Sequence, residues 1–276
     1  MMKLGNYKVH YLNGGITHID GGAMFGVVPK ALWTKKYEVN EKNQIPLPTH
    51  PILIQTEDKN IIVDTGIGTG KLTDKERKIF GVHYESDMEN DLKALNLTLE
   101  DIDYVLMTHL HFDHAAGLTD NDGHAIFSNA IHVLQQDEWH EFQSPNIRSK
   151  STYWQKNNGD FKNKLILFED EIEIYPGIQI RHTGGHSYGH SVVTIESEGE
   201  KAVHMGDIFP TLAHRNPLWV TAYDDYPMQS IREKERLIPN YILQDYWFLY
   251  YHDAKYFAVK FDKHKLNEIE TYITRN

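Results

Sequence analysis

The sequence predicts an α/β protein in which two stacked β-sheets carry helices on their outer faces. Short apolar runs typical of buried strands alternate along the chain with segments of helical periodicity. Strands come first, helices follow, and strands and helices then recur, as expected for layered sheets covered by helices. Several apolar runs end directly in histidine or aspartate, at the strand ends where α/β sheets place their active sites.

Length and composition predict one globular domain, residues 1–276. The chain is 40% hydrophobic and 24% charged, and no repeat, low-complexity tract or linker divides it. No run reaches the roughly 18 apolar residues that a membrane-spanning helix requires. The first residues also lack the apolar core of a secretory signal. We therefore expect a cytoplasmic protein that does not bind membranes.

The charge balance excludes some partners. Because 28 Lys and Arg stand against 39 Asp and Glu, the formal net charge is −11. A nucleic-acid partner is disfavoured, since it would require clustered basic residues. The chain has no cysteine, which excludes disulfides and thiolate ligands. It has 17 histidines, of which the site described below needs five.

The expected elements of the first half are mainly strands. Alternating polar and apolar residues predict a half-buried strand over 7–12, and residues 52–56 and 60–64 predict a hairpin. The glycine-rich stretch 20–30 predicts a bulged strand, a loop that presents apolar side chains, or a simple edge of the core. We further expect helices at 71–80, 88–95 and 135–142, and strands at 104–107 and 130–134.

The second half begins with the polar stretch 144–160, which predicts an excursion over the surface that could act as a lid. A short hairpin is expected over 172–182. An amphipathic helix is expected over 228–238, stopped by Pro239. A final helix is expected over 263–273. The strands that end in candidate site residues are 178–183, 201–205 and 247–251.

The strongest functional signal is His109-x-His111-x-Asp113-His114, which directly follows the strand 104–107. Imidazole nitrogens and carboxylate oxygens suit divalent transition metals such as zinc. Alternate residues of an extended segment point the same way, so His109 and His111 can share one ion. A turn after His111 would direct Asp113 and His114 at a second ion. The alternative is a solvent-exposed, histidine-rich turn.

Four further residues stand at strand ends. His186, Asp207 and His252 each follow an apolar run, although His182 and His190 compete with His186. Asp207 could instead cap the turn after Gly206, and His252 could be an ordinary strand-end histidine. Asp64 ends the strand 60–64, where it could accept a hydrogen bond from a metal-bound histidine or simply form a turn.

These residues, in this order from Asp64-Thr65-Gly66 to His252, resemble the metallo-β-lactamase superfamily. The motif His-Leu-His-Phe-Asp-His-Ala and the pair His252-Asp253 most resemble the quorum-quenching N-acyl-homoserine-lactone lactonases of this superfamily. The resemblance implies a four-layer αβ/βα sandwich with a dinuclear metal site between the sheets.

The resemblance also implies two bound divalent ions, with zinc as the expected metal, and the residues that bind them. The first ion would be held by His109, His111 and His186, and the second by Asp113, His114 and His252. Asp207 would bridge both. The implied activity is the opening of a lactone or related ester by attack of a metal-bridging hydroxide, with Asp113 as the catalytic residue that relays a proton to the leaving oxygen.

One position departs from the lactonases, which carry a tyrosine three residues after the bridging aspartate. Pro210 stands there, so either His214 or Tyr223 is expected to donate to the substrate oxygen, or the substrate differs. The residues considered for holding an acyl chain are Met24, Phe25 and Trp33.

The expected partner is therefore a small-molecule lactone or ester, and a homodimer is left open. The alternatives are a hydrolase of the same fold that acts on thioesters, aryl esters or organophosphates, and a di-iron redox protein.

Overall fold

Two seven-stranded β-sheets form the centre of the molecule in the computed structural model, which describes residues 1–275. The strands of the first sheet, in spatial order, are β1 (Met2–Leu4), β2 (Tyr7–Tyr11), β5 (Ile52–Gln55), β6 (Asn60–Val63), β7 (Tyr104–Leu106), β8 (Ile131–Gln135) and β9 (Leu165–Phe168). Those of the second sheet are β10 (Glu171–Tyr175), β11 (Ile178–His182), β12 (Ser191–Ser197), β13 (Glu200–His204), β14 (Trp247–Leu249), β15 (Tyr256–Phe261) and β16 (Ile269–Thr274). A small separate sheet pairs β3 (Ile16–Asp20) with β4 (Gln44–Pro48).

The helices are short, apart from one. They are α1 (Gly21–Phe25), α2 (Lys30–Trp33), α3 (Asp74–Ile79), α4 (Met88–Ala94), α5 (Phe112–Ala115), α6 (Gln136–Gln143) and α7 (Pro227–Leu243). Single 3₁₀ turns occur at Leu99–Asp101, Ala116–Leu118, Ser149–Ser151, Gln155–Asn157, Asp160–Lys164, Gly206–Ile208 and Leu212–Arg215. Among the helices of residues 1–275, none combines the length and the apolar character needed to cross a bilayer.

The two sheets pack face to face across a shared apolar core. Ile52, Ile54 and Val63 of the first sheet and Val193 and Ile195 of the second belong to this buried cluster. Successive residues of a strand point to opposite faces, so the residues directly before and after these point outward, away from the shared core. The sheets are therefore buried on both faces, which explains why their strands are nearly continuous apolar runs in the sequence.

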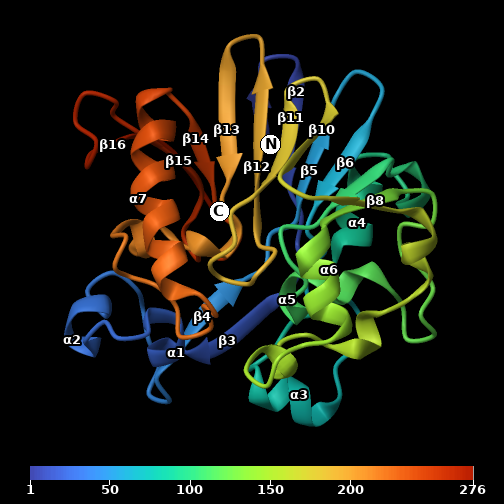
Figure 1. Ribbon diagram of the computed structural model, residues 1–276, viewed down its shortest axis with the longest axis horizontal. Helices are drawn as coiled ribbons and strands as arrows, with labels where there is room; N and C mark the ends of the chain where they lie inside the picture. The colour runs from blue at the N-terminus through green and yellow to red at the C-terminus, as the bar shows by residue number, and fades with distance from the viewer. Residues whose placement is uncertain (276) are drawn as a thin grey trace.

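Helices cover the outer face of each sheet. Leu53 and Ile62 pack outward in one cluster with Leu92 of α4 and Phe142 of α6. On the other side, the sheet residues Val192, Val203 and Phe248 pack outward with Leu237 and Tyr241 of α7. Figure 1 shows the resulting order of layers, from α7 through the two sheets to α4 and α6. The order confirms the predicted four-layer αβ/βα sandwich.

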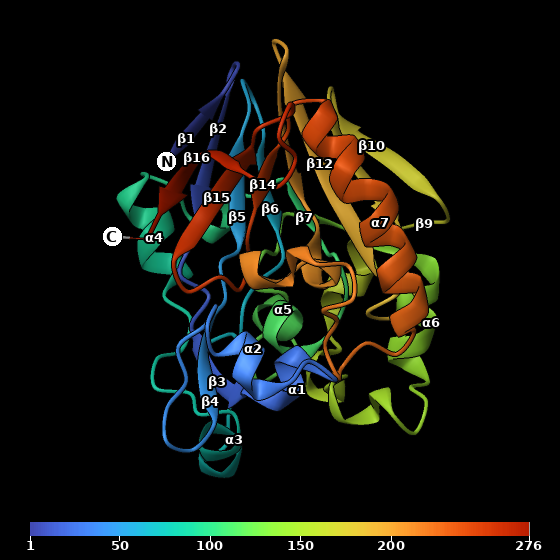
Figure 2. The same ribbon diagram turned by 90° about the vertical axis from the view of Figure 1, so that its left-hand side faces the viewer.

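The strand directions place the candidate site at one end of the sandwich. β6, β7 and β8 run parallel, as do β13 and β14. The loops that follow β6 and β7 therefore leave the first sheet at one end, and those that follow β13 and β14 leave the second sheet at one end. Candidate residues of the two sheets lie together there, since His109 and His114 form a cluster with Asp207. The short helix α5, which belongs to the histidine-rich loop, lies below both sheets in Figure 2, with α1 and α2 beneath it.

Two expectations for the C-terminal half are wrong. Residues 263–273 do not form a helix, because 269–274 form the edge strand β16, antiparallel to β15. Their β-branched and aromatic residues favour a strand once a sheet edge is available. Pro239 does not stop the preceding helix but lies within α7, which continues to Leu243. Packing of Tyr241 and Ile242 on the sheet offsets the lost hydrogen bond, which costs about 3 kcal/mol in a helix interior.

The glycine-rich stretch 20–30 is neither a bulged strand nor a loop with exposed apolar side chains. It contains the short helix α1, whose N-cap residue Asp20 accepts a hydrogen bond from the backbone N of Ala23 at 3.1 Å. Met24, Phe25 and Trp33 are at most 4% exposed and belong to a small separate core. Of the three interpretations, the edge of the core is the nearest, because the side chains are buried, although the core to which they belong is a separate one.

Candidate metal centre

The histidine-rich loop continues directly from β7. His109 and His111 lie in the extended segment after the strand, and α5 begins at Phe112, which turns Asp113 and His114 away from them. Glu138 of α6 holds the loop, since its Oε1 atom accepts a hydrogen bond from the backbone N of Leu110 at 2.7 Å. The local structure therefore divides the motif into two pairs, as its spacing predicts.

The fold brings together all seven residues that the sequence singles out, although they come from four separate segments. None is more than 9% exposed. One cluster, with its ligand atoms within 4.8 Å of one another, is His109, His111 and His186. A second cluster of the same size is Asp113, His114 and His252. The histidine-rich loop is therefore buried and is not a solvent-exposed turn.

Asp207 lies between the two clusters, and each of its oxygens faces one of them. Its Oδ2 atom is 3.5 Å from Nε2 of His186 and 3.9 Å from Nε2 of His109. Its Oδ1 atom is 3.4 Å from Nε2 of His114 and 3.5 Å from Nε2 of His252. Burial opposes ionisation of this carboxyl, but His114 and His252 hold its pKa well below the ordinary value. The group between the clusters is therefore a carboxylate.

Three of the histidines have the same orientation, with Nδ1 directed outward to a hydrogen-bond acceptor. Nδ1 of His114 donates to Asp64 Oδ2, Nδ1 of His186 donates to Asp224 Oδ1, and Nδ1 of His252 donates to the carbonyl O of Pro48, each at 2.9 Å. These acceptors carry no proton, so the hydrogen-bond network assigns the proton to Nδ1. Each Nε2 atom then faces the centre, where the neutral form of the imidazole would offer its lone pair to a metal ion.

The interior of the site has buried polar atoms without protein partners. Nε2 of His109 and Oδ1 of Asp207 accept or donate no hydrogen bond within residues 1–275. Nε2 of His186 lies 2.9 Å from Nδ1 of His111, so two imidazole nitrogens face each other. Unpaired buried polar atoms of this kind are costly. Nitrogen and carboxylate donors converging in this way fit divalent cations.

Asp64 supports the site from the end of β6. It accepts hydrogen bonds at 2.8 Å from both the backbone N and the Oγ1 of Thr108, in addition to the one from His114. Burial opposes its ionisation, but His114 and His204 hold its pKa below the ordinary value. Its φ of 57° lies in the left-handed region, which is strained for a residue other than glycine. Of the two interpretations of Asp64, the structure favours support of a histidine.

Three supporting residues are not apparent from the sequence. Asp224 orients His186, and His190 accepts a hydrogen bond at 3.0 Å from the backbone N of Asp207. Glu138 accepts hydrogen bonds from Leu110 N and from Ser187 Oγ, so it joins the loops of the two clusters. Burial raises the pKa of Glu138 to about 7. The sequence gives no local signal for these roles, because each partner lies 17 or more residues away along the chain.

The two candidates for the donor that replaces the lactonase tyrosine differ in availability. His214 is excluded, since its Nε2 bonds the carbonyl O of Met24 at 2.8 Å and its Nδ1 bonds Thr211 Oγ1 at 2.8 Å. Tyr223 is half-buried beside the site. Burial, followed by the negative charge of Asp113, raises its pKa to about 12. Tyr223 therefore keeps its proton at neutral pH and can donate it in a hydrogen bond.

The stretch 144–160 packs more closely than a free lid would. Tyr153 is 2% exposed and donates a hydrogen bond to Glu138 Oε1 at 2.9 Å. Arg148 forms an ion pair with Asp225 at 2.7 Å, next to the residue that orients His186. The segment therefore forms one wall beside the site.

Comparison with known proteins agrees with this fold. Residues 45–240 match the family model of the metallo-beta-lactamase superfamily, and the chain belongs to that superfamily. A solved structure described as a probable metal-dependent hydrolase from Staphylococcus aureus is 68% identical, with a TM-score of 0.98 over 100% of this chain and 99% of that one.

Lactonases are among the more distant relatives. An N-acyl homoserine lactonase of Bacillus cereus is 32% identical over 165 residues, which are 56% of this chain and 61% of the relative. The chain thus matches about three fifths of the length of these curated relatives. AidC, described as a dizinc quorum-quenching lactonase, has a TM-score of 0.81 at 18% identity, over 100% of this chain and 96% of that one. This likeness shows a shared fold.

Proposed function

We propose that this protein is a metal-dependent hydrolase that opens lactones, with N-acyl-homoserine lactones as the substrate class. The similarity to curated N-acyl homoserine lactonases, at 30 to 32% identity, supports the substrate class. The site supports the same chemistry, because it brings histidines and carboxylates together in buried clusters, with the neutral phenol of the half-buried Tyr223 beside them. The proposed substrate is a small molecule, and the enzyme is expected to be cytoplasmic.

The proposed cofactor is a pair of divalent ions, with zinc as the expected metal. His109, His111 and His186 would hold one ion, and Asp113, His114 and His252 the other. Asp207 would be shared, since its two oxygens face different clusters. Ions bound there would polarise a substrate carbonyl and lower the pKa of a bound water to about 7.

The remaining steps fall to side chains of the site. Asp113 is 9% exposed, and its Oδ2 atom lies 3.5 Å from Nε2 of His252. This carboxylate would accept a proton from the attacking water and deliver it to the leaving alkoxide. Tyr223 would donate a hydrogen bond to the substrate oxygen on which negative charge develops. Tyr223 thus takes the role that Pro210 cannot fill.

A substrate panel tests the proposal. Rates on N-acyl-homoserine lactones, aryl esters, thioesters and phosphotriesters are compared for the wild type, His109→Ala and Asp207→Ala. The exposed His264 supplies a matched control, His264→Ala. We expect the highest kcat/KM on lactones and background rates for the two site variants. Full lactone-opening activity in variants that retain metal would contradict the site, and a higher kcat/KM on another class would contradict the lactone assignment.

A further inference from the structure

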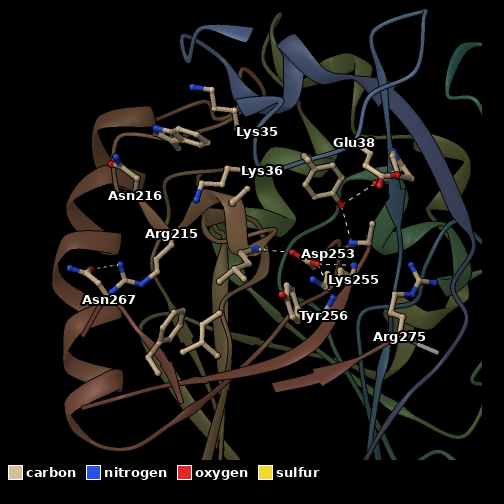
Figure 3. Close-up of a pocket in the computed structure, with 18 residues that line it drawn as sticks. Lys35, Lys36, Glu38, Arg215, Asn216, Asp253, Lys255, Tyr256, Asn267 and Arg275 are labelled. Carbon is tan, nitrogen blue, oxygen red and sulfur yellow. Dashed lines mark hydrogen bonds between the residues drawn. The ribbon is translucent and has the colours of Figure 1, made fainter. Parts of the chain in front are cut away.

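A pocket lies outside the metal centre. It has a volume of about 870 Å³ and none of the seven candidate ligands lines it. Its walls come from the segment after α2, the turn Leu212–Arg215, the loop before β15 and the C-terminal residues, as Figure 3 shows. Its volume lies within the range of about 300–1,000 Å³ that is typical of sites for small molecules.

Basic side chains outnumber acidic ones in this pocket, although the chain as a whole carries a net charge of −11. Figure 3 shows them on several sides of the space, with Arg215 and Arg275 on opposite sides. The five are Lys35, Lys36, Arg215, Lys255 and Arg275. All the Lys and Arg ion pairs found in residues 1–275 involve other basic residues.

The two acidic residues of the pocket offset only part of this charge, because two carboxylates stand against five basic side chains. Asp253 is 4% exposed, and its carboxylate is occupied by backbone donors. Its Oδ1 accepts hydrogen bonds from Lys255 N and Tyr256 N, both at 2.8 Å, and its Oδ2 accepts one from Leu212 N at 2.9 Å. Glu38 is exposed and forms no ion pair with these five residues.

Arg215 is held in place without an acidic partner. Its guanidinium donates to Asn267 Oδ1 at 2.7 Å and to the carbonyl O of Leu266, and it lies 4.8 Å from the ring centre of Phe261. Its Nε is buried and has no hydrogen-bond partner within residues 1–275. A half-buried guanidinium bonded only to neutral acceptors is available to an anion, and its planar donors suit phosphate oxygens.

Aromatic rings complete the walls beside these charges. Tyr37, Trp219, Tyr256 and Phe261 line the same pocket. A ligand that binds there is therefore expected to combine negative charge with a flat or apolar body. We propose that the pocket is a binding site for a phosphate-bearing small molecule with an aromatic portion, separate from the metal centre.

The wall between the two sites is thin. The hydroxyl of Tyr37 lies 3.1 Å from the carbonyl O of His252 and accepts a hydrogen bond from Ala254 N at 2.9 Å. Asp253 and Ala254, which follow the candidate ligand, thus line the pocket, while the imidazole of His252 faces the metal centre. A phosphate in the pocket would contact the basic side chains and not the cluster of histidines.

Calorimetric titration of the metal-loaded protein tests the proposal, with adenosine monophosphate as the probe and adenosine as the neutral comparison. Lys36→Gln/Lys255→Gln removes two exposed cations of the pocket, and Arg275→Gln removes a third independently. The matched control is Lys75→Gln/Lys78→Gln, which removes two exposed lysines of α3. Circular dichroism checks that each variant is folded.

We expect one adenosine monophosphate per chain, bound at least tenfold more tightly than adenosine. Affinity should fall at least tenfold in both pocket variants and stay unchanged in the α3 control. Binding no tighter than that of adenosine would overturn the proposal. Unchanged affinity in both pocket variants would also overturn it, because the phosphate would then bind elsewhere, such as at the metal centre. An equal loss of affinity in the α3 control would also overturn the proposal, because the affinity would then depend only on the net charge of the protein.

Discussion

Nδ1 of His186 donates a hydrogen bond to Oδ1 of Asp224 at 2.9 Å, and both residues are only 2% exposed. Asp224 also accepts a hydrogen bond from Thr221 Oγ1 at 2.7 Å, which fixes its orientation. The carboxylate thus holds the imidazole with Nε2 towards Asp207. Partners of this kind fix both the ring and the tautomer of a metal-binding histidine.

Asp224→Ala is therefore expected to weaken metal binding about 10- to 100-fold. The loss follows because His186 would be free to rotate and to protonate at Nε2. Competition with a chelator of known affinity measures the effect, with the exposed Asp74→Ala as the control. Equal metal affinities in the two variants would show that Asp224 does not orient His186.

Glu138 makes the stability of the protein depend on pH. Burial raises its pKa from the ordinary 4.5 to about 7, so the folded state binds this proton more tightly than the unfolded state. The stabilisation is complete below the unfolded pKa and is lost as the pH rises towards about 7. A difference of this size corresponds to about 3 kcal/mol.

Glu138→Gln keeps hydrogen-bonding groups at the same positions but cannot ionise. We expect the free energy of unfolding of the wild type, relative to this variant, to fall by about 3 kcal/mol between pH 4.5 and 7. Urea unfolding at a series of pH values measures the difference. A constant difference across this interval would mean that Glu138 titrates as an ordinary carboxyl.

Tyr223→Phe is expected to lower kcat for lactone opening about 100-fold, the usual effect of removing a donor to a developing oxyanion. KM and metal content should change little, because the phenol is not among the candidate ligands. The exposed Tyr226 gives the control, Tyr226→Phe, which should retain wild-type rates. An active Tyr223→Phe variant would leave the substrate oxygen to some other donor.

Gly117 closes the histidine-rich loop against the end of β6. A Cβ atom at this position would lie 2.1 Å from the carbonyl O of Thr65, so the backbone would have to move. The same segment is tied to the loop by the hydrogen bond from Thr65 N to His114 O at 2.7 Å. Close approach of two backbones therefore requires glycine here.

We expect Gly117→Ala to lower the free energy of unfolding by about 2 kcal/mol or more. Gly199→Ala is the control, since its Cβ would meet no atom within 4 Å and only its positive φ makes it costly, by about 1 kcal/mol. Thermal unfolding compares the two. A smaller loss for Gly117→Ala than for Gly199→Ala would contradict the close approach.

The sequence was informative where a function depends on neighbouring residues. The motif from His109 to His114 predicts its own division into two pairs, because a strand end followed by a short helix fixes the direction of each side chain. The strand ends at His186, Asp207 and His252 are also visible as apolar runs. The layers of the fold follow from the same runs, since strands buried on both faces are nearly continuously apolar.

The supporting residues of the site and the ends of some elements depend on tertiary contacts, which the sequence does not show. Asp224 and Glu138 become supporting residues only because distant loops pack beside them, 38 and 28 residues away from His186 and Leu110. The strand β16 forms because β15 has a free edge with which it can pair. The helix α7 continues past Pro239 because its apolar residues there are buried against the sheet. Phe25 could not be recognised as a core residue before its stacking on Trp33 and His214 was known.

The most direct test is the metal content of the purified protein, measured by mass spectrometry together with protein concentration. Two divalent ions per chain are predicted for the wild type, and about one for His252→Ala, which removes a ligand of a single cluster. The exposed variant His264→Ala should retain two. A wild-type protein that holds no more than one ion, or a His252→Ala variant that still holds two as tightly, would contradict the dinuclear site.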